Sequence, residues 1–188
     1  MQNKYSGNVS DFQPVVEDAS RVVISYGLTD LGDGKAEWFE VVFYKKQGKP
    51  SFNQAKEAIL KDINDQTDEA ILCGMDWTIL HGDDEGKTVK VWLSKENQEN
   101  FKAKHDAAIQ YPQVVKFPMK YKIGEFEGST PAYENFQNIE ELAQFYLGGL
   151  AYIEQCYNAG WQRKDSIDWA PYEEALNPSE TPKKGRKK

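Results

Sequence analysis

Strand-like segments occur in neighbouring pairs along this sequence, and helical segments separate the pairs. Residues 21–26 and 38–44 are rich in β-branched and aromatic side chains and flank the turn residues Gly32-Asp33-Gly34. Residues 75–80 and 87–93 flank a polar loop, and the second of these segments alternates apolar with polar side chains. Such pairs form antiparallel hairpins, whereas parallel strands need long crossovers. The sequence therefore predicts an α+β fold of antiparallel β-hairpins packed with about three helices.

Two helices are predicted from apolar residues at helical spacing. A capping-box pattern precedes the first, over residues 52–64. Ser94 can cap the second, over residues 95–110, which must end before Pro112. Each helix would turn one apolar face toward the core.

A third helix has the strongest pattern. It opens at Asn138 with Glu141, and apolar residues then recur at steps of three and four. Gly160 is predicted to end the helix as a C′ residue, which gives Trp161 the hydrophobic contact of a Schellman motif.

The remaining elements are shorter. Residues 114–121 predict a strand interrupted by Pro118, which favours an edge position, and residues 133–136 are expected to pair with it. Residues 167–176 predict a last short docking segment.

The length of 188 residues fits one compact domain with tails. Residues 1–18 are mostly polar and predict a flexible N-terminal arm. The single α+β domain is then expected over 19–176, followed by a basic, disordered C-terminal tail over 177–188.

Charge is distributed unevenly. The net charge is −7, yet the last twelve residues carry +4, so the rest of the chain is near −11. An acidic body repels phosphate, which leaves nucleic acid as a possible partner only through the tail. The basic residues of the tail are Lys183, Lys184, Arg186, Lys187 and Lys188.

Cysteine usage and hydropathy set the expected compartment. Cys73 and Cys156 lie far apart and suggest no disulfide framework. The first eleven residues lack the apolar region of a signal peptide, and no run of 18 apolar residues occurs. We expect neither secretion by a signal peptide nor a membrane partner.

No catalytic, cofactor-binding or metal-binding residues are predicted. The loop 82–88 resembles a phosphate-binding loop, but it has three residues between its glycines instead of four, and these are acidic. A turn between strands is the favoured interpretation. The two histidines, His81 and His105, and the two cysteines are scattered without metal-ligand spacing or a nucleophile–base pair. We therefore expect a protein that is not an enzyme.

The aromatic residues are the candidate interaction sites. Trp77 and Trp92 could form a sugar-binding platform, although core packing is the favoured interpretation of tryptophans within strands. Trp161, Trp169 and Tyr172 are candidate anchors for a protein partner wherever they are exposed.

Two stretches resemble a known group of proteins. They are residues 91–101, which join a tryptophan strand to a capped polar helix, and residues 152–161 at the end of the third helix. Together with the elements between them, they resemble small uncharacterised proteins of tailed phages and prophages of gut bacteria, similar to a domain of unknown function in phage tail fibres. The resemblance covers about residues 50–161.

This resemblance implies a role in the virion or its assembly. We expect a non-catalytic structural protein, tail or tail-fibre related, that binds other virion proteins or copies of itself and is oligomeric when assembled. It would occur in the virion or in the host cytoplasm during assembly. The alternatives are a tail-fibre assembly chaperone and a carbohydrate-binding or carbohydrate-active module.

Overall fold

The computed structural model describes residues 4–177, which divide into two compact units. Unit 1 contains the described residues up to Gln66 and from Trp161 onward, and unit 2 is Thr67–Gly160. Helices and antiparallel sheets occur in both, so the α+β class is confirmed. The prediction of one domain is corrected to two units, because each unit buries its own apolar cluster. The apolar pattern marks which faces are buried but not which faces meet.

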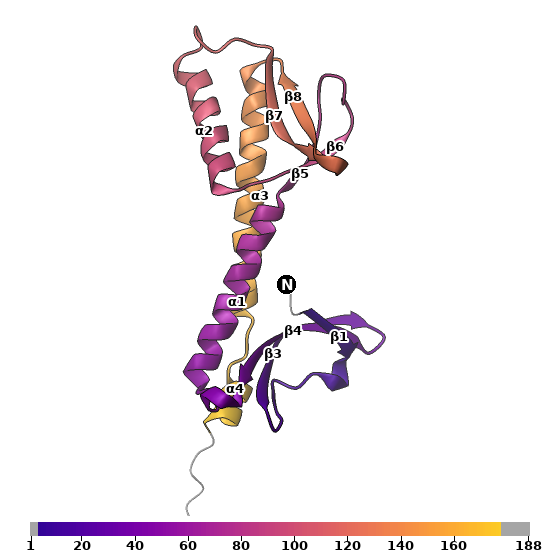
Figure 1. The fold of residues 1–188 in the computed structure, drawn as a ribbon, viewed down its shortest axis with the longest axis vertical. Helices are drawn as coiled ribbons and strands as arrows, with labels where there is room; N and C mark the ends of the chain where they lie inside the picture. The colour runs from indigo at the N-terminus through magenta and orange to yellow at the C-terminus, as the bar shows by residue number, and fades with distance from the viewer. Residues whose placement is uncertain (1–3, 178–188) are drawn as a thin grey trace, which may run out of the picture. The chain divides into compact units, whose positions relative to one another are not determined.

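Unit 1 combines a four-stranded antiparallel sheet with helical segments (Figure 1). Helices α1 and α3 each contribute one part to unit 1 and one part to unit 2. The elements are β1 (Lys4–Asn8), η1 (Val9–Asp11), β2 (Val15–Glu17), β3 (Arg21–Gly32), β4 (Lys35–Tyr44), η2 (Lys45–Gln47), α1 (Phe52–Cys73), α3 (Ile139–Asp165) and α4 (Ala170–Leu176).

The sheet of unit 1 has the strand order β1-β4-β3-β2, and β3 with β4 forms the hairpin predicted from the sequence. Alternate residues of β3 point into the core, as the two-residue period of a strand requires. These residues are Val22, Ile24 and Tyr26, and they cluster with Ala55, Ile59 and Ile63 of α1 and with Tyr172 and Leu176 of α4. The predicted docking segment is thus confirmed as α4.

The N-terminal segment is not an arm over its described residues. Strand β1 pairs with β4, and β2 pairs with β3, at the two edges of the sheet. Between these strands, the ring of Phe12 packs edge-on against Trp38 at 6.1 Å. A Cβ at Gly7 would lie 2.7 Å from the same indole. The few apolar residues of the segment therefore complete an existing sheet, which local composition cannot reveal.

Helix α1 is longer than predicted, running to Cys73 instead of residue 64. Its inner face continues through Gln66, Thr67 and Ile71, which are all buried. Gln66 donates to the Tyr26 hydroxyl at 3.0 Å and accepts from Arg163 at 2.6 Å. Because these bonds satisfy the amide, a polar residue can occupy a core position of the helix.

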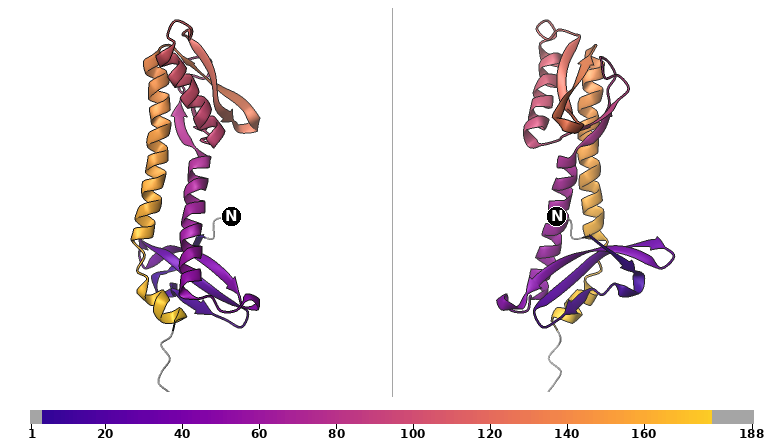
Figure 2. Two further views of the ribbon diagram at one scale, coloured as in Figure 1. Left: turned by 90° about the vertical axis from the view of Figure 1, so that its left-hand side faces the viewer. Right: turned by 45° about the vertical axis from the view of Figure 1, so that its right-hand side comes forward.

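Unit 2 contains the hairpins β5–β6 and β7–β8, helix α2, and parts of α1 and α3 (Figure 2). Besides its parts of α1 and α3, its elements are β5 (Met75–Thr78), β6 (Thr88–Val91), α2 (Lys95–Gln110), β7 (Met119–Phe126), η3 (Glu127–Ser129) and β8 (Thr130–Phe136). The pairing of β5 with β6 and the bounds of α2 are as predicted. Strand β7 begins after Pro118 rather than spanning it, because proline lacks the N–H that a ladder needs.

Helix α3 passes through Gly160 and ends at Asp165, so the predicted C′ glycine is wrong. A Cβ at Gly160 would lie 2.5 Å from Oγ1 of Thr67 in α1. The glycine therefore permits close approach of two helices rather than a chain reversal. Trp161 lies within the helix rather than at the C″ position of a Schellman motif.

The core of unit 2 is centred on Phe145 of α3. Its ring packs against Trp77, Phe101 and Phe136 at centroid distances of 5.0, 5.0 and 5.4 Å. These rings come from β5, α2 and β8, so a single side chain joins both hairpins to the helices. Within residues 4–177, no helix is both long and apolar enough to cross a bilayer.

Candidate functional site

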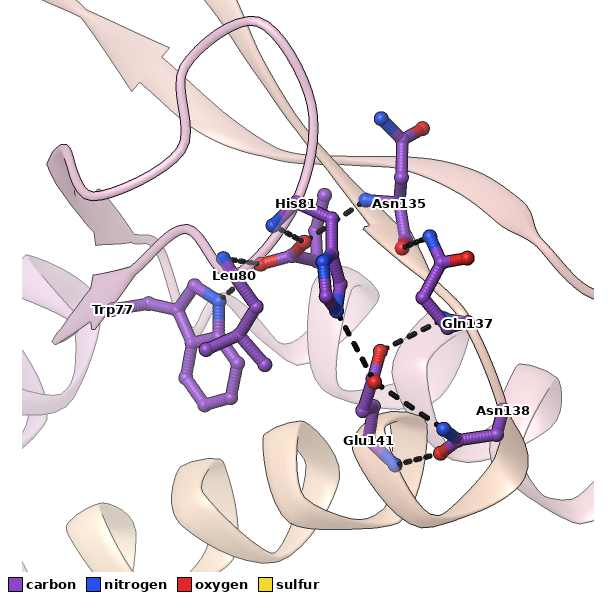
Figure 3. A network of polar contacts seen from close by, with 8 residues as sticks. Trp77, Leu80, His81, Asn135, Gln137, Asn138 and Glu141 are labelled. Atoms are coloured by element: carbon purple, nitrogen blue, oxygen red, sulfur yellow. Dashed lines mark hydrogen bonds and ion pairs between the residues drawn. The ribbon is translucent and has the colours of Figure 1, made fainter.

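A polar network in unit 2 brings together Trp77, Leu80, His81 and Asn135 (Figure 3). These residues all donate to the fully buried carboxylate of Glu134. Its Oε2 accepts from the indole N–H of Trp77 at 2.9 Å and from the Leu80 N–H at 2.7 Å. Its Oε1 accepts from the N–H groups of His81 and Asn135, both at 3.0 Å. Four donors thus surround the two oxygens.

This network is suited to holding the fold rather than to chemistry. A buried carboxyl group is costly unless it is hydrogen-bonded, and here both oxygens have two donors each. The bonds attach the chain after β5 to β8. Strand patterning did not identify Glu134, because an acid in a strand is usually solvent-facing.

A second carboxylate, Glu141, closes the network at the first turn of α3 (Figure 3). It accepts from the Gln137 N–H at 2.7 Å, and its Oε1 lies 3.2 Å from Nε2 of His81. Its own N–H donates to Asn138 at 2.9 Å, as the predicted helix opening requires. Burial acts to raise the pKa of Glu141, but these hydrogen bonds and the charge of His81 lower the pKa below its ordinary value.

The loop between β5 and β6 is a turn, as predicted. Gly86 N–H donates to Ile79 C=O at 2.9 Å, and Lys87 pairs with Asp84 at 2.7 Å. The lysine that a phosphate-binding loop would aim at its ligand is therefore bonded within the turn. Among residues 4–177, no group of three histidine, cysteine or acidic side chains could hold a metal ion.

The structure divides the predicted aromatic residues into two classes. Trp77 is half-buried and its N–H is bonded to Glu134. Tyr172 lies in the core of unit 1, where its hydroxyl donates to Ser25 C=O at 2.8 Å, so it offers no surface to a partner. Trp169 is half-buried beside Phe52. Only the Trp92 and Trp161 side chains are widely exposed, at 47% and 56%.

Trp92 borders a small pocket of 210 Å³. The pocket is lined by Trp92, Asn97, Phe101, Lys122, Ile123 and Gly124. Trp77 is not among these residues, since its ring packs on Phe145. The two indoles do not form the shared platform that a sugar-binding site would use, which removes the observation that favoured that alternative.

An apolar groove lies between α2 and α3 of unit 2, which run side by side (Figure 2). Its volume is 270 Å³. The apolar and aromatic lining residues are Leu93, Phe101, Tyr146, Gly149, Leu150 and Ile153, and the polar rim is Lys95, Gln98, Glu99 and Lys102. An apolar floor with a polar rim is typical of a site for another molecule's side chains.

One wall of the groove is held by a stacked pair. The rings of His105 in α2 and Tyr146 in α3 lie 4.6 Å apart at an interplanar angle of 27°. Gly149 leaves space at the base of the groove because it has no side chain. A Cβ at this position would lie 3.6 Å from Leu93. Sequence analysis could not find this groove, since its walls come from helices about fifty residues apart.

The basic residues of the predicted tail lie outside the described residues. Comparisons of the chain with protein-family models, curated proteins and solved structures found no match. The resemblance to phage proteins therefore stays a prediction.

Proposed function

We propose that the protein is a non-catalytic binding protein that acts through the groove between α2 and α3. In the setting that the sequence resemblance implies, it is a tail-related or tail-fibre-related virion component whose partner is another virion protein. The observation that carries the proposal is the groove itself, an open apolar surface on two regular helices.

The groove has the features of a protein-binding surface. Leu150 lines the groove and exposes 45% of its surface, and Tyr146 is already ordered by its stack on His105. A partner side chain that enters the groove therefore gains apolar burial without first ordering Tyr146. Buried anchors of this kind supply most of the energy of a typical interface.

The first experiment measures binding of the purified full chain to each structural protein of the particle, by calorimetry. Leu150→Lys places a charge in the groove and is expected to weaken binding at least about tenfold. Glu69→Lys, at an exposed position of α1 in unit 2, is the matched control and is expected to bind normally. Equal binding by both variants, or no binding to any particle protein, would contradict the proposal.

Mass spectrometry separates the structural role from the chaperone alternative. A virion component is expected in purified particles at a fixed ratio to the tail proteins. A chaperone is expected in infected-cell lysate and absent from the particles.

A further inference from the structure

The exposed side of α3 in unit 2 carries residues at the spacing of a helix–helix seam. Leu147, Leu150 and Tyr157 expose 57%, 45% and 42% of their surface. Together with exposed Glu154 they follow steps of three, four and three residues, which places all four on one side of the helix. We call these four residues the α3 seam. It is about 15 Å long at the 1.5 Å rise of a helix.

The α3 seam lies in a segment that is nearly without charge. From Leu142 to Gly160 the only charged residue is Glu154, in a sequence that is 28% charged and carries a net charge of −7. Loss of charged residues beside apolar and aromatic ones distinguishes the centre of an interface from ordinary surface. Because two acidic chains repel each other elsewhere, a face with little charge is where two copies can approach.

We propose that a second copy of this chain packs its α3 seam antiparallel against the first. The inference rests on the proposed function, that the protein acts by protein binding, and names one partner for a surface that shares Leu150 with the groove. Antiparallel packing about position 152 sets Leu147 opposite Tyr157 of the second copy, and Leu150 opposite Glu154. The contact is two-fold symmetric and closes on itself.

The carboxylate of Glu154 determines whether the two α3 helices pack parallel or antiparallel. Parallel packing in register would set Glu154 directly against its counterpart, which is unfavourable in a desolvated seam. Antiparallel packing offsets the two carboxylates by about 6 Å along the axis and lays each aliphatic stem on Leu150. Ala151 and Asn158, exposed beside the seam, are short enough to let the helices approach.

The length of the seam limits the affinity. A seam about 15 Å long buries less surface than a standard protein–protein interface. The dimer is therefore expected to have a dissociation constant in the micromolar range. Self-association should therefore depend on concentration.

Sedimentation equilibrium of the full chain, from about 1 μM to about 500 μM, tests the inference. The wild type is expected to shift from monomer to dimer. Leu147→Arg is expected to raise the dissociation constant at least about tenfold, because it buries a charge in the seam. Ala159→Arg adds the same charge to α3 at an exposed position on the opposite side and should dimerise normally. A wild type that stays monomeric, or equal dimerisation of both variants, overturns the inference.

Glu154→Gln tests the partner more sharply, because it removes the charge and keeps the aliphatic stem that packs on Leu150. Removing the only charge of the seam should tighten a dimer about fivefold, whereas a partner that pairs a basic residue with Glu154 would bind less tightly. Unchanged or weaker self-association overturns the antiparallel arrangement. Because Leu150 belongs to both the groove and the α3 seam, Leu147→Arg separates the two proposals, since Leu147 does not line the groove. Normal calorimetric binding of a virion protein by a chain that stays strictly monomeric would refute only the second-copy proposal.

Discussion

The indole N–H of Trp77 donates to Oε2 of Glu134 over 2.9 Å, which joins β5 to β8 through a buried carboxylate. The same oxygen accepts from Leu80 N–H, so one atom fixes both a side chain and the backbone that follows β5. The relationship assigns Trp77 a structural role in unit 2, so its indole N–H is already bonded within the fold.

Glu134→Gln should destabilise unit 2 locally by about 3 kcal/mol. The amide has only one acceptor oxygen, so its NH₂ group faces two N–H donors that it cannot satisfy. Amide hydrogen exchange at Leu80 or His81 should accelerate accordingly. Glu69→Gln, an exposed acid of unit 2, is the control and should leave exchange at both amides unchanged. Unchanged protection in Glu134→Gln would show that the carboxylate does not hold this segment.

Alanine substitution of two glycines in α3 should change the stability of the protein in opposite directions. Gly160→Ala places a Cβ 2.5 Å from Thr67 Oγ1, so the Thr67 side chain or the helices must shift, at a cost of about 2 kcal/mol. Gly149→Ala places a Cβ at an ordinary 3.6 Å from Leu93 and gains helix propensity of about 0.8 kcal/mol. Thermal unfolding of each variant measures both effects. A stabilising Gly160→Ala would contradict the close approach of α1 and α3.

Alkaline pH should destabilise unit 1 through Tyr172. Burial first, and the charge of Asp168 second, raise its pKa to about 12, above the ordinary value of 10.0. Because the folded pKa is raised, this contribution to stability is complete below pH 10 and is lost as the pH rises toward 12. Tyr172→Phe should flatten the fall in stability over that range, at a cost of about 1 kcal/mol at neutral pH for the lost hydrogen bond to Ser25. Denaturant unfolding at a series of pH values measures how steeply the free energy of unfolding falls in the wild type and in Tyr172→Phe. Identical slopes for the two proteins would refute the assignment to Tyr172.

Acid should loosen the start of α3 through Glu141. Its folded pKa is lowered, so the stabilisation is present above the ordinary value of 4.5 and is lost as the pH falls through the folded pKa. Hydrogen exchange at the Gln137 N–H, which donates to this carboxylate, should accelerate over that window. Glu141→Gln should remove most of this pH dependence. A variant that retains the full dependence would place the titrating group elsewhere.

The sequence predicted the elements better than their associations. The hairpins of β3–β4 and β5–β6 follow from strand pairs with short turns, and α2 follows from the Ser94 cap and Pro112. The strands in residues 4–17 could not be predicted, since their few apolar residues are buried only by a sheet formed later in the chain. Gly160 was misinterpreted because a glycine for close approach resembles a helix stop when its neighbour in space is unknown.

Less of the candidate site was predictable. Trp92 and Trp161 are exposed, as interaction anchors must be, whereas Tyr172 is buried because α4 docks onto the sheet. The groove depends on α2 and α3 meeting, and the α3 seam becomes visible only when the other faces of the helix are known to be covered. Periodicity picked out residues such as Leu142, Tyr146 and Ile153 of α3, which pack in the core of unit 2, and it did not assign Leu147 or Leu150.

Site-specific photo-crosslinking during assembly tests the binding account most directly. A crosslinking residue in place of Glu99, at the rim of the groove, is expected to give a discrete adduct with a virion protein, while the same residue at exposed Glu69 is expected to give none. A Glu99 adduct that Leu150→Lys abolishes would support binding through the groove. Absence of an adduct at Glu99, or the same adducts at Glu69, would contradict it.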